Sequence, residues 1–149
     1  MRRLAFALLL VLAAAANAQD KRVDQKAAIK ACSGKVNDEC VVRYFKDTVE
    51  ASIIRGRAVF QNYCMLCHGP EGKGDGRAAR LHNPPPYNLT RSVASRDYIS
   101  QVIRKGGAAM GRGKGMPPWS DQLTDEQIGD VLNYAFSIRQ PLKPVSGTS

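Results

Sequence analysis

The chain has 149 residues, which fits one domain with extensions, and its 22 lysines and arginines outnumber its 13 aspartates and glutamates, giving a formal net charge of +9 at pH 7. Despite this charge, no basic run interleaved with aromatic residues occurs, so the composition does not indicate a protein that binds nucleic acid.

The first 18 residues have the three parts of a secretory signal peptide. Arg2 and Arg3 form a basic start, Leu4 to Ala16 is an apolar run, and Ala16-Asn17-Ala18 fits a small-x-small cleavage site. The run is too short to span a membrane, which takes about 20 residues. No cysteine follows the cleavage point, so we expect no lipid or other stable membrane anchor. We expect cleavage near Ala18 and a periplasmic mature protein.

Residues 19–54 are predicted to form an N-terminal extension with helical stretches at 23–31 and 41–54, where apolar residues have loose helical spacing. Cys32 and Cys40 flank turn-forming residues between these stretches. In an oxidising compartment the two thiols most simply form a structural disulfide with each other. Two free thiols, or a bridge to another chain, are the alternatives.

The pentapeptide Cys64-Met65-Leu66-Cys67-His68 is the attachment signature of c-type haem. Thiols three residues apart lie on one side of a helical turn and can add to the two vinyl groups of a porphyrin. The imidazole that follows can bind the iron as the proximal ligand. A thioredoxin-like dithiol would need a βαβ context, and a zinc site would need a second close pair of ligands; the sequence indicates neither.

A helix is predicted from Arg55 to Cys64, because Gly56, Phe60 and Cys64 recur every four residues and share one face. A glycine on that face indicates that another backbone approaches closely. The alternating glycines of residues 69–76 predict a loop after the haem motif.

Residues 83–87, Asn-Pro-Pro-Pro-Tyr, are predicted to be stiff extended chain. Such a segment can present a backbone carbonyl to the second ring nitrogen of His68. A plain surface spacer is the alternative. His82 is a lone loop histidine, which we expect to face solvent and not to bind iron.

A further helix is predicted over residues 95–105 and ends at Gly106-Gly107. The loop that follows holds two thioether sulfurs, on Met110 and Met116, and thioether is a soft ligand suited to iron. Met116 is the predicted ligand, because two prolines and a tryptophan fix the chain that leaves it. Met110 lies among alanines and glycines and remains the competing candidate.

The last helix is predicted over residues 123–139, with Thr124 as its N-cap and Gln127 completing a capping box. Its apolar stripe consists of Ile128, Val131, Leu132, Ala135 and Ile138. Pro141 ends this helix, and residues 141–149 are predicted to be a flexible tail.

Together these features resemble the class I cytochromes c of the small bacterial monohaem kind. Gly56-x-x-x-Phe60-x-x-x-Cys64 resembles the family's first helix, Met116-Pro117 its sixth-ligand loop, and Val131-x-x-Tyr134 its last helix, whose aromatic ring packs across the first. The cytochrome domain is expected over residues 55–140. The extension and the glycine-rich ligand loop depart from the family's pattern.

The resemblance implies an all-α, cytochrome c-like fold wrapped around one covalently attached haem c. It implies thioethers on Cys64 and Cys67, and iron bound by His68 and Met116. It also implies that a carbonyl around Pro84 to Pro86 meets His68. It further implies a one-electron carrier and not an enzyme. The alternatives are a dedicated haem subunit of a larger dehydrogenase or oxidase, and a peroxidase or gas-binding protein.

The basic side chains are concentrated between the haem motif and Trp119. Residues 72–119 hold nine basic side chains and two acidic ones. A surface of one sign steers a partner of the opposite sign and raises its rate of association. We therefore expect redox partners with acidic docking surfaces. Ordinary solvating charges are the alternative.

Overall fold

The computed structural model describes Cys32 and residues 37–141, and these contain helices and no strand. The predicted all-α fold is thus confirmed for this part of the chain. The chain divides into two compact units, residues 1–46 and 47–149. The predicted signal peptide, the helical stretch at 23–31 and residues 142–149 of the tail lie outside the described residues.

In the first unit, α2 (Asp38–Tyr44) is a short helix whose N-cap is Asn37. The Asn37 side-chain oxygen accepts a hydrogen bond from the Cys40 backbone N–H over 2.9 Å. Cys40 is buried and disulfide-bonded to Cys32, with 6.0 Å between the two Cα atoms. The prediction of a single helical stretch over residues 41–54 is wrong, because α2 ends at Tyr44 and a new helix starts after Thr48.

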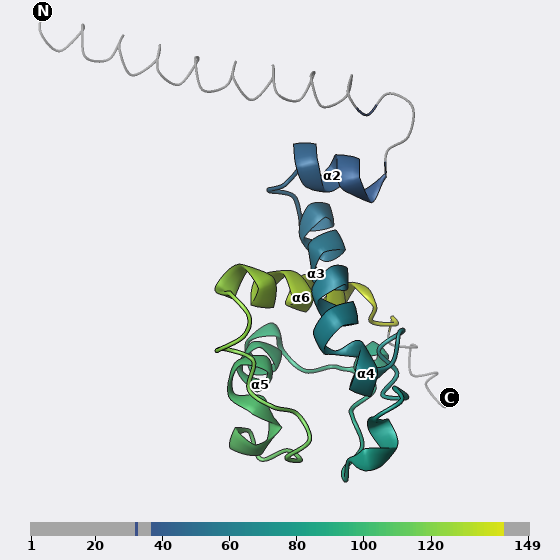
Figure 1. Cartoon of the computed structure of the whole chain (residues 1–149), viewed down its shortest axis with the longest axis vertical. Coiled ribbons are helices and arrows are strands. Elements are labelled where there is room, and N and C mark those ends of the chain that lie inside the picture. Colours follow the sequence, from purple (N-terminus) through teal and green to yellow (C-terminus); the bar gives the residue numbers. More distant parts are fainter. Residues whose placement is uncertain (1–31, 33–36, 142–149) are drawn as a thin grey trace, which may run out of the picture. The chain divides into compact units, whose positions relative to one another are not determined.

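The second unit contains four α-helices and two short 3-10 turns among its described residues (Figure 1). In chain order they are α3 (Val49–Tyr63), α4 (Met65–His68), η1 (Ala79–Leu81), η2 (Leu89–Arg91), α5 (Arg96–Ala109) and α6 (Asp125–Ser137). Helix α3 begins earlier than the predicted Arg55, because the Thr48 side chain caps it by accepting a hydrogen bond from the Ala51 N–H over 3.2 Å.

Helices α3 and α6 cross near their middles (Figure 1). Gly56 lies at the crossing, where a Cβ atom would collide with the backbone carbonyl of Asp130. One turn further on, the rings of Phe60 and Tyr134 pack with their centroids 5.2 Å apart. The close approach predicted at Gly56 and the predicted aromatic contact between the two helices are therefore both confirmed.

The buried core of this unit gathers around the crossing. Its members come from α3, α5, α6 and the chain just before α6: Val59, Phe60, Ile103, Leu123, Ile128, Val131 and Leu132. The predicted stripe of α6 supplies three of these residues, and Ala135 of the same stripe is also buried. Since apolar burial is the dominant stabilising term in folding, this cluster fixes how the helices pack.

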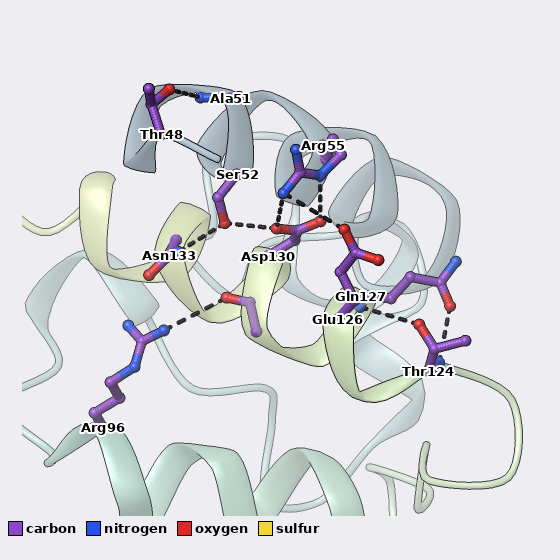
Figure 2. Close-up of polar contacts among 11 residues, drawn as sticks. Thr48, Ala51, Ser52, Arg55, Arg96, Thr124, Glu126, Gln127, Asp130 and Asn133 are labelled. Carbon is purple, nitrogen blue, oxygen red and sulfur yellow. Dashed lines mark hydrogen bonds and ion pairs between the residues drawn. The ribbon is translucent and has the colours of Figure 1, made fainter. Parts of the chain in front are cut away.

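A polar cluster that the sequence did not reveal joins the same two helices (Figure 2). Asp130 of α6 is 5% exposed and accepts hydrogen bonds from Ser52 Oγ at 2.5 Å and from Arg55 Nε at 2.7 Å. Asn133 Nδ2 donates to Ser52 Oγ over 2.7 Å. The hydrogen bond from Arg55 to Asp130 raises the pKa of Arg55. The partners compensate the cost of burying the Asp130 carboxylate.

The capping box predicted for α6 is confirmed. Thr124 Oγ1 accepts a hydrogen bond from the Gln127 N–H over 3.2 Å, and the Gln127 side chain accepts one from the Thr124 N–H over 2.9 Å (Figure 2). The helix ends at Ser137, slightly before the predicted Arg139.

Helix α5 follows its prediction as far as Lys105. At Gly106 the backbone leaves the helical region, with φ 78° and ψ 165°, and a short further turn runs through Gly107 to Ala109. The predicted stop at Gly106-Gly107 is thus a kink, because glycine adopts the positive φ that other residues avoid.

Candidate haem site

The two cysteines of the pentapeptide lie where α3 passes into α4. Cys64 is the last residue associated with α3, and its N–H donates to the Phe60 carbonyl over 2.9 Å. Its own carbonyl accepts from the His68 N–H over 2.8 Å, which closes the turn that carries Cys67 and His68. Neither cysteine is in a disulfide. Both thiols are therefore available for other chemistry.

The surroundings of Cys64 bear on the dithiol and zinc alternatives. Burial, and then the neighbouring Cys67, raise the pKa of the Cys64 thiol to about 12. A reactive redox thiol instead has a lowered pKa, because the thiolate is the nucleophile. In the part of the chain that the structure describes, no three His, Cys, Asp or Glu side chains gather to hold a metal ion. Neither alternative gains support from this geometry.

The imidazole of His68 is oriented by a backbone carbonyl. Its Nδ1 lies 3.2 Å from the carbonyl oxygen of Tyr87. The prediction that residues 83–87 present a carbonyl to this ring is therefore confirmed, and the carbonyl belongs to Tyr87, next to the Pro84–Pro86 that the resemblance implied. Burial lowers the pKa of His68, and the bond to Tyr87 opposes this effect. A neutral ring that donates from Nδ1 keeps the Nε2 lone pair for a metal.

The sequence predicted that His82 faces solvent. In the structure the side chain does not simply do so. Its ring is partly buried, and its Nε2 lies 3.6 Å from Cys67 Sγ. A Cβ atom on Gly115 would collide with the same ring. His82 thus lies between the cysteine turn and the loop that carries Met116.

The two candidate methionines differ in their surroundings. Met116 is partly buried and packs against the core cluster, whereas Met110 is not among the described residues that do so. Met110 follows α5 as its C-cap. The carbonyl of Met116 accepts a hydrogen bond from the Gly107 N–H over 2.8 Å. This packing favours Met116 as the thioether ligand.

An open cavity of about 710 Å³ lies where two segments beside the site meet. It is lined by Leu81, His82 and Asn83 and by residues 112–115 and Pro117. Two unpaired thiols, an oriented imidazole and a partly buried thioether together supply the groups that hold a haem. The residues present therefore fit this cofactor.

Two side-chain contacts that the sequence did not indicate hold the ligand loop. The ring of Tyr63, next to Cys64, meets the indole of Trp119 edge-on with centroids 5.5 Å apart. Arg112 Nε donates to the Tyr98 hydroxyl of α5 over 2.7 Å. The sequence gave no signal for the contact between the rings of Tyr63 and Trp119.

The family described as cytochrome C oxidase, cbb3-type, subunit III matches residues 51–134. The chain belongs to this cytochrome c family. The predicted resemblance to class I cytochromes c and the cytochrome c-like fold are thereby confirmed.

Two curated relatives agree with this assignment. The cytochrome is 28% identical over 94 residues to the cbb3-type cytochrome c oxidase subunit FixP of Sinorhizobium medicae (strain WSM419), a match that covers 62% of this chain and 32% of FixP. It is 30% identical over 81 residues to cytochrome c6 of Bryopsis maxima, covering 54% of this chain and 85% of cytochrome c6. The chain thus spans about a third of FixP and most of cytochrome c6.

One solved structure shares the fold. It belongs to the Kuenenia stuttgartiensis reducing HAO-like protein complex Kustc0457/Kustc0458, with a TM-score of 0.52 at 23% identity, and the match covers 61% of this chain and 45% of that one. Membership of the cytochrome c family implies that the cytochrome binds haem and takes part in electron transfer. Among its described residues, no helix is long and apolar enough to cross a membrane.

Proposed function

We propose that this cytochrome is a periplasmic one-electron carrier with a single haem c. Cys64 and Cys67 would hold the haem through thioethers, and His68 and Met116 would bind its iron. One observation carries the proposal: the Cys-x-x-Cys-His turn presents an imidazole already fixed by the Tyr87 carbonyl. The turn also lies near the loop of Met116, since His82 contacts Cys67 and a Cβ atom on Gly115 would collide with the His82 ring.

The bound haem would supply the single iron that changes oxidation state. The protein's part would be to hold that iron: His68 would bind it through Nε2, because Nδ1 is engaged by Tyr87, and Met116 would bind it through its sulfur. A thioether ligand raises the reduction potential. With His68 and Met116 both bound to the iron, no position would be left for a substrate. This argues for a carrier and against a peroxidase or a gas-binding protein.

Charge at the cavity supports an acidic redox partner. Arg112 and Lys114 line the cavity, and none of its lining residues is acidic. Two other basic residues of the 72–119 segment have acidic partners within this chain, since Lys73 pairs with Glu71, and Arg104 pairs with Asp125 over 2.5 Å. The charge that a partner would meet at the cavity is therefore that of Arg112 and Lys114.

Absorption spectra of the oxidised protein test the ligand assignment. We expect a sulfur-to-iron charge-transfer band in the far red for the wild type, its loss in Met116→Ala, and its retention in Met110→Ala. The reduced Met116→Ala variant should also bind carbon monoxide. Loss of the band in Met110→Ala in place of Met116→Ala would overturn the assignment of the sixth ligand.

A dedicated haem subunit of a larger complex is the second candidate function. It is favoured by relatives whose names are those of an oxidase subunit and of a multi-protein complex. Here residues 19–46, the mature part of the first compact unit, would serve as a docking element. A stoichiometric partner that co-purifies with the full chain, and is lost when residues 19–46 are deleted, would establish this function. The deletion should leave the haem spectrum unchanged.

A further inference from the structure

We propose that Gly107 is a positioning residue for the sixth ligand. The end of α5 forms a seat for the loop of Met116, and this seat exists only because residue 107 has no side chain. The inference rests on the proposed function, in which Met116 binds the iron.

Backbone hydrogen bonds tie Gly107 to the loop from both sides. The Gly107 N–H donates to the Met116 carbonyl over 2.8 Å, and the Gly107 carbonyl accepts from the Arg112 N–H over 2.8 Å. One buried residue therefore holds both the start of the loop and the ligand residue itself.

The available space explains why residue 107 is a glycine. A Cβ atom there would collide with the Gly113 carbonyl oxygen and would lie 3.5 Å from both Arg112 Cβ and Met116 Cβ. Gly107 is not among the glycines with positive φ, so its backbone suits alanine as well as glycine. A substitution at this position thus acts through space alone, unlike one at Gly106, where φ is 78°.

Other contacts also hold this loop, but they involve residues before and after Met116 and not Met116 itself. The Arg112 side chain is bonded to Tyr98, and the Trp119 N–H donates to the Ile103 carbonyl over 3.0 Å. Among the backbone bonds of the described residues, the one that reaches Met116 comes from Gly107. A functional site tolerates displacements of only about 0.5 Å. Displacing the Gly113 carbonyl to make room for a methyl group would move the loop further than that.

The test compares Gly107→Ala with Gly129→Ala in the mature, haem-loaded protein. Gly129 lies in α6, and a Cβ atom there meets nothing within 4 Å, so this variant is a matched control. We expect both variants to carry covalent haem by mass spectrometry. Gly107→Ala should lose the sulfur-to-iron band, bind carbon monoxide when reduced, and have a lowered reduction potential. Gly129→Ala should match the wild type in all three.

The outcomes separate this inference from the proposed function. A wild type without the band, which binds carbon monoxide freely, refutes methionine ligation itself. A wild type with the band, together with a Gly107→Ala variant that keeps it and excludes carbon monoxide, refutes the seat and leaves the carrier standing.

A second pair of variants applies if Gly107→Ala does not fold. Ala108→Gly loosens the same turn, because glycine adds backbone freedom at a residue whose carbonyl accepts from the Gly111 N–H over 3.2 Å. Ala58→Gly makes the same substitution at an exposed position of α3. Imidazole should displace the methionine several-fold faster in Ala108→Gly than in Ala58→Gly. Equal rates would refute the seat.

Discussion

Asp130 carries its charge where little water reaches it. Only 5% of the residue is exposed, and its carboxylate accepts hydrogen bonds from Ser52 and Arg55 of the crossing helix. A buried carboxylate without partners would cost several kcal/mol of stability. The main effect of the cluster is therefore to fix how α3 and α6 cross, and its attraction matters less. Only one register of α3 against α6 gives Asp130 its hydrogen-bond partners.

The Asp130→Asn substitution tests this condition. Removing the charge leaves Arg55 without its closest carboxylate, and we expect the free energy of unfolding to fall by about 2 to 4 kcal/mol. Chemical denaturation followed by circular dichroism measures the change. Asp125→Asn is the control, because Asp125 pairs with Arg104 at an exposed site, where such pairs contribute about 1 kcal/mol or less. Equal losses in the two variants would contradict the role given to Asp130.

Side-chain chemistry was predictable at this scale, and backbone chemistry was not. Cys64, Cys67 and His68 form a motif whose spacing predicts the attachment of haem. Residues 83–87 were predicted to supply the carbonyl that meets His68, but the sequence did not show that this carbonyl would be that of Tyr87. Every residue has a carbonyl, so only the path of the loop selects one. The contact of His82 with Cys67 likewise depends on how the chain after η1 meets helix α4.

At the scale of elements, the crossing of α3 and α6 organises the domain. Gly56 lets the backbones approach, and Phe60 and Tyr134 fill the next turn with their rings. The cysteine turn begins directly after α3, so the angle of this crossing also sets where Cys64 and His68 lie.

Two glycines in helices should respond in opposite directions to the same substitution. Gly56→Ala places a methyl group against the Asp130 carbonyl and should destabilise the protein by more than about 2 kcal/mol, as overpacked cores do. Gly129→Ala meets open space and should stabilise α6 by about 0.5 to 1 kcal/mol. Parallel thermal denaturation of the two variants decides this, and a stabilised Gly56→Ala variant would contradict the crossing.

Helices with strong local signals were predictable. The capping box of α6 and its apolar stripe placed that helix to within two residues at each end. The start of α3 was missed, because a threonine cap without a capping-box partner is a weak signal, and the apolar residues on either side of it seemed continuous. The helix was predicted to end at Gly106, where it instead kinks. The sequence shows that a glycine interrupts a helix, but it does not show that another helical turn follows.

At the scale of the whole molecule, charge governs how partners approach. The formal charge of the chain is +9, and it is 9 − 2 = +7 without Arg2 and Arg3. The salt dependence of the reaction rate with small charged oxidants reports the sign of this charge. Salt at 0.1 M screens the attraction or repulsion between oxidant and protein beyond about 10 Å. We expect the rate of oxidation by anionic hexacyanoferrate(III) to fall as salt is added, and the rate with a cationic cobalt(III) complex to rise.

The Lys114→Glu variant tests whether the charge at the cavity controls this salt dependence. Lys114 lines the cavity, whereas Lys105 on α5 does not and serves as a control with the same change of charge. The slope of the oxidation rate against salt should flatten more in Lys114→Glu than in Lys105→Glu. Identical slopes would show that only the net charge matters and that electrons do not leave through this cavity.

The central claim is that one haem is bound covalently to the turn of Cys64 and Cys67, and a single mass measurement tests it. The mature protein is produced in a host that matures cytochromes c, extracted with acidified acetone and digested with trypsin. Cleavage after Arg57 and Lys73 releases the peptide of residues 58–73. We expect this peptide to carry the added mass of one haem. An unmodified peptide, with the pigment in the acetone, would contradict the account.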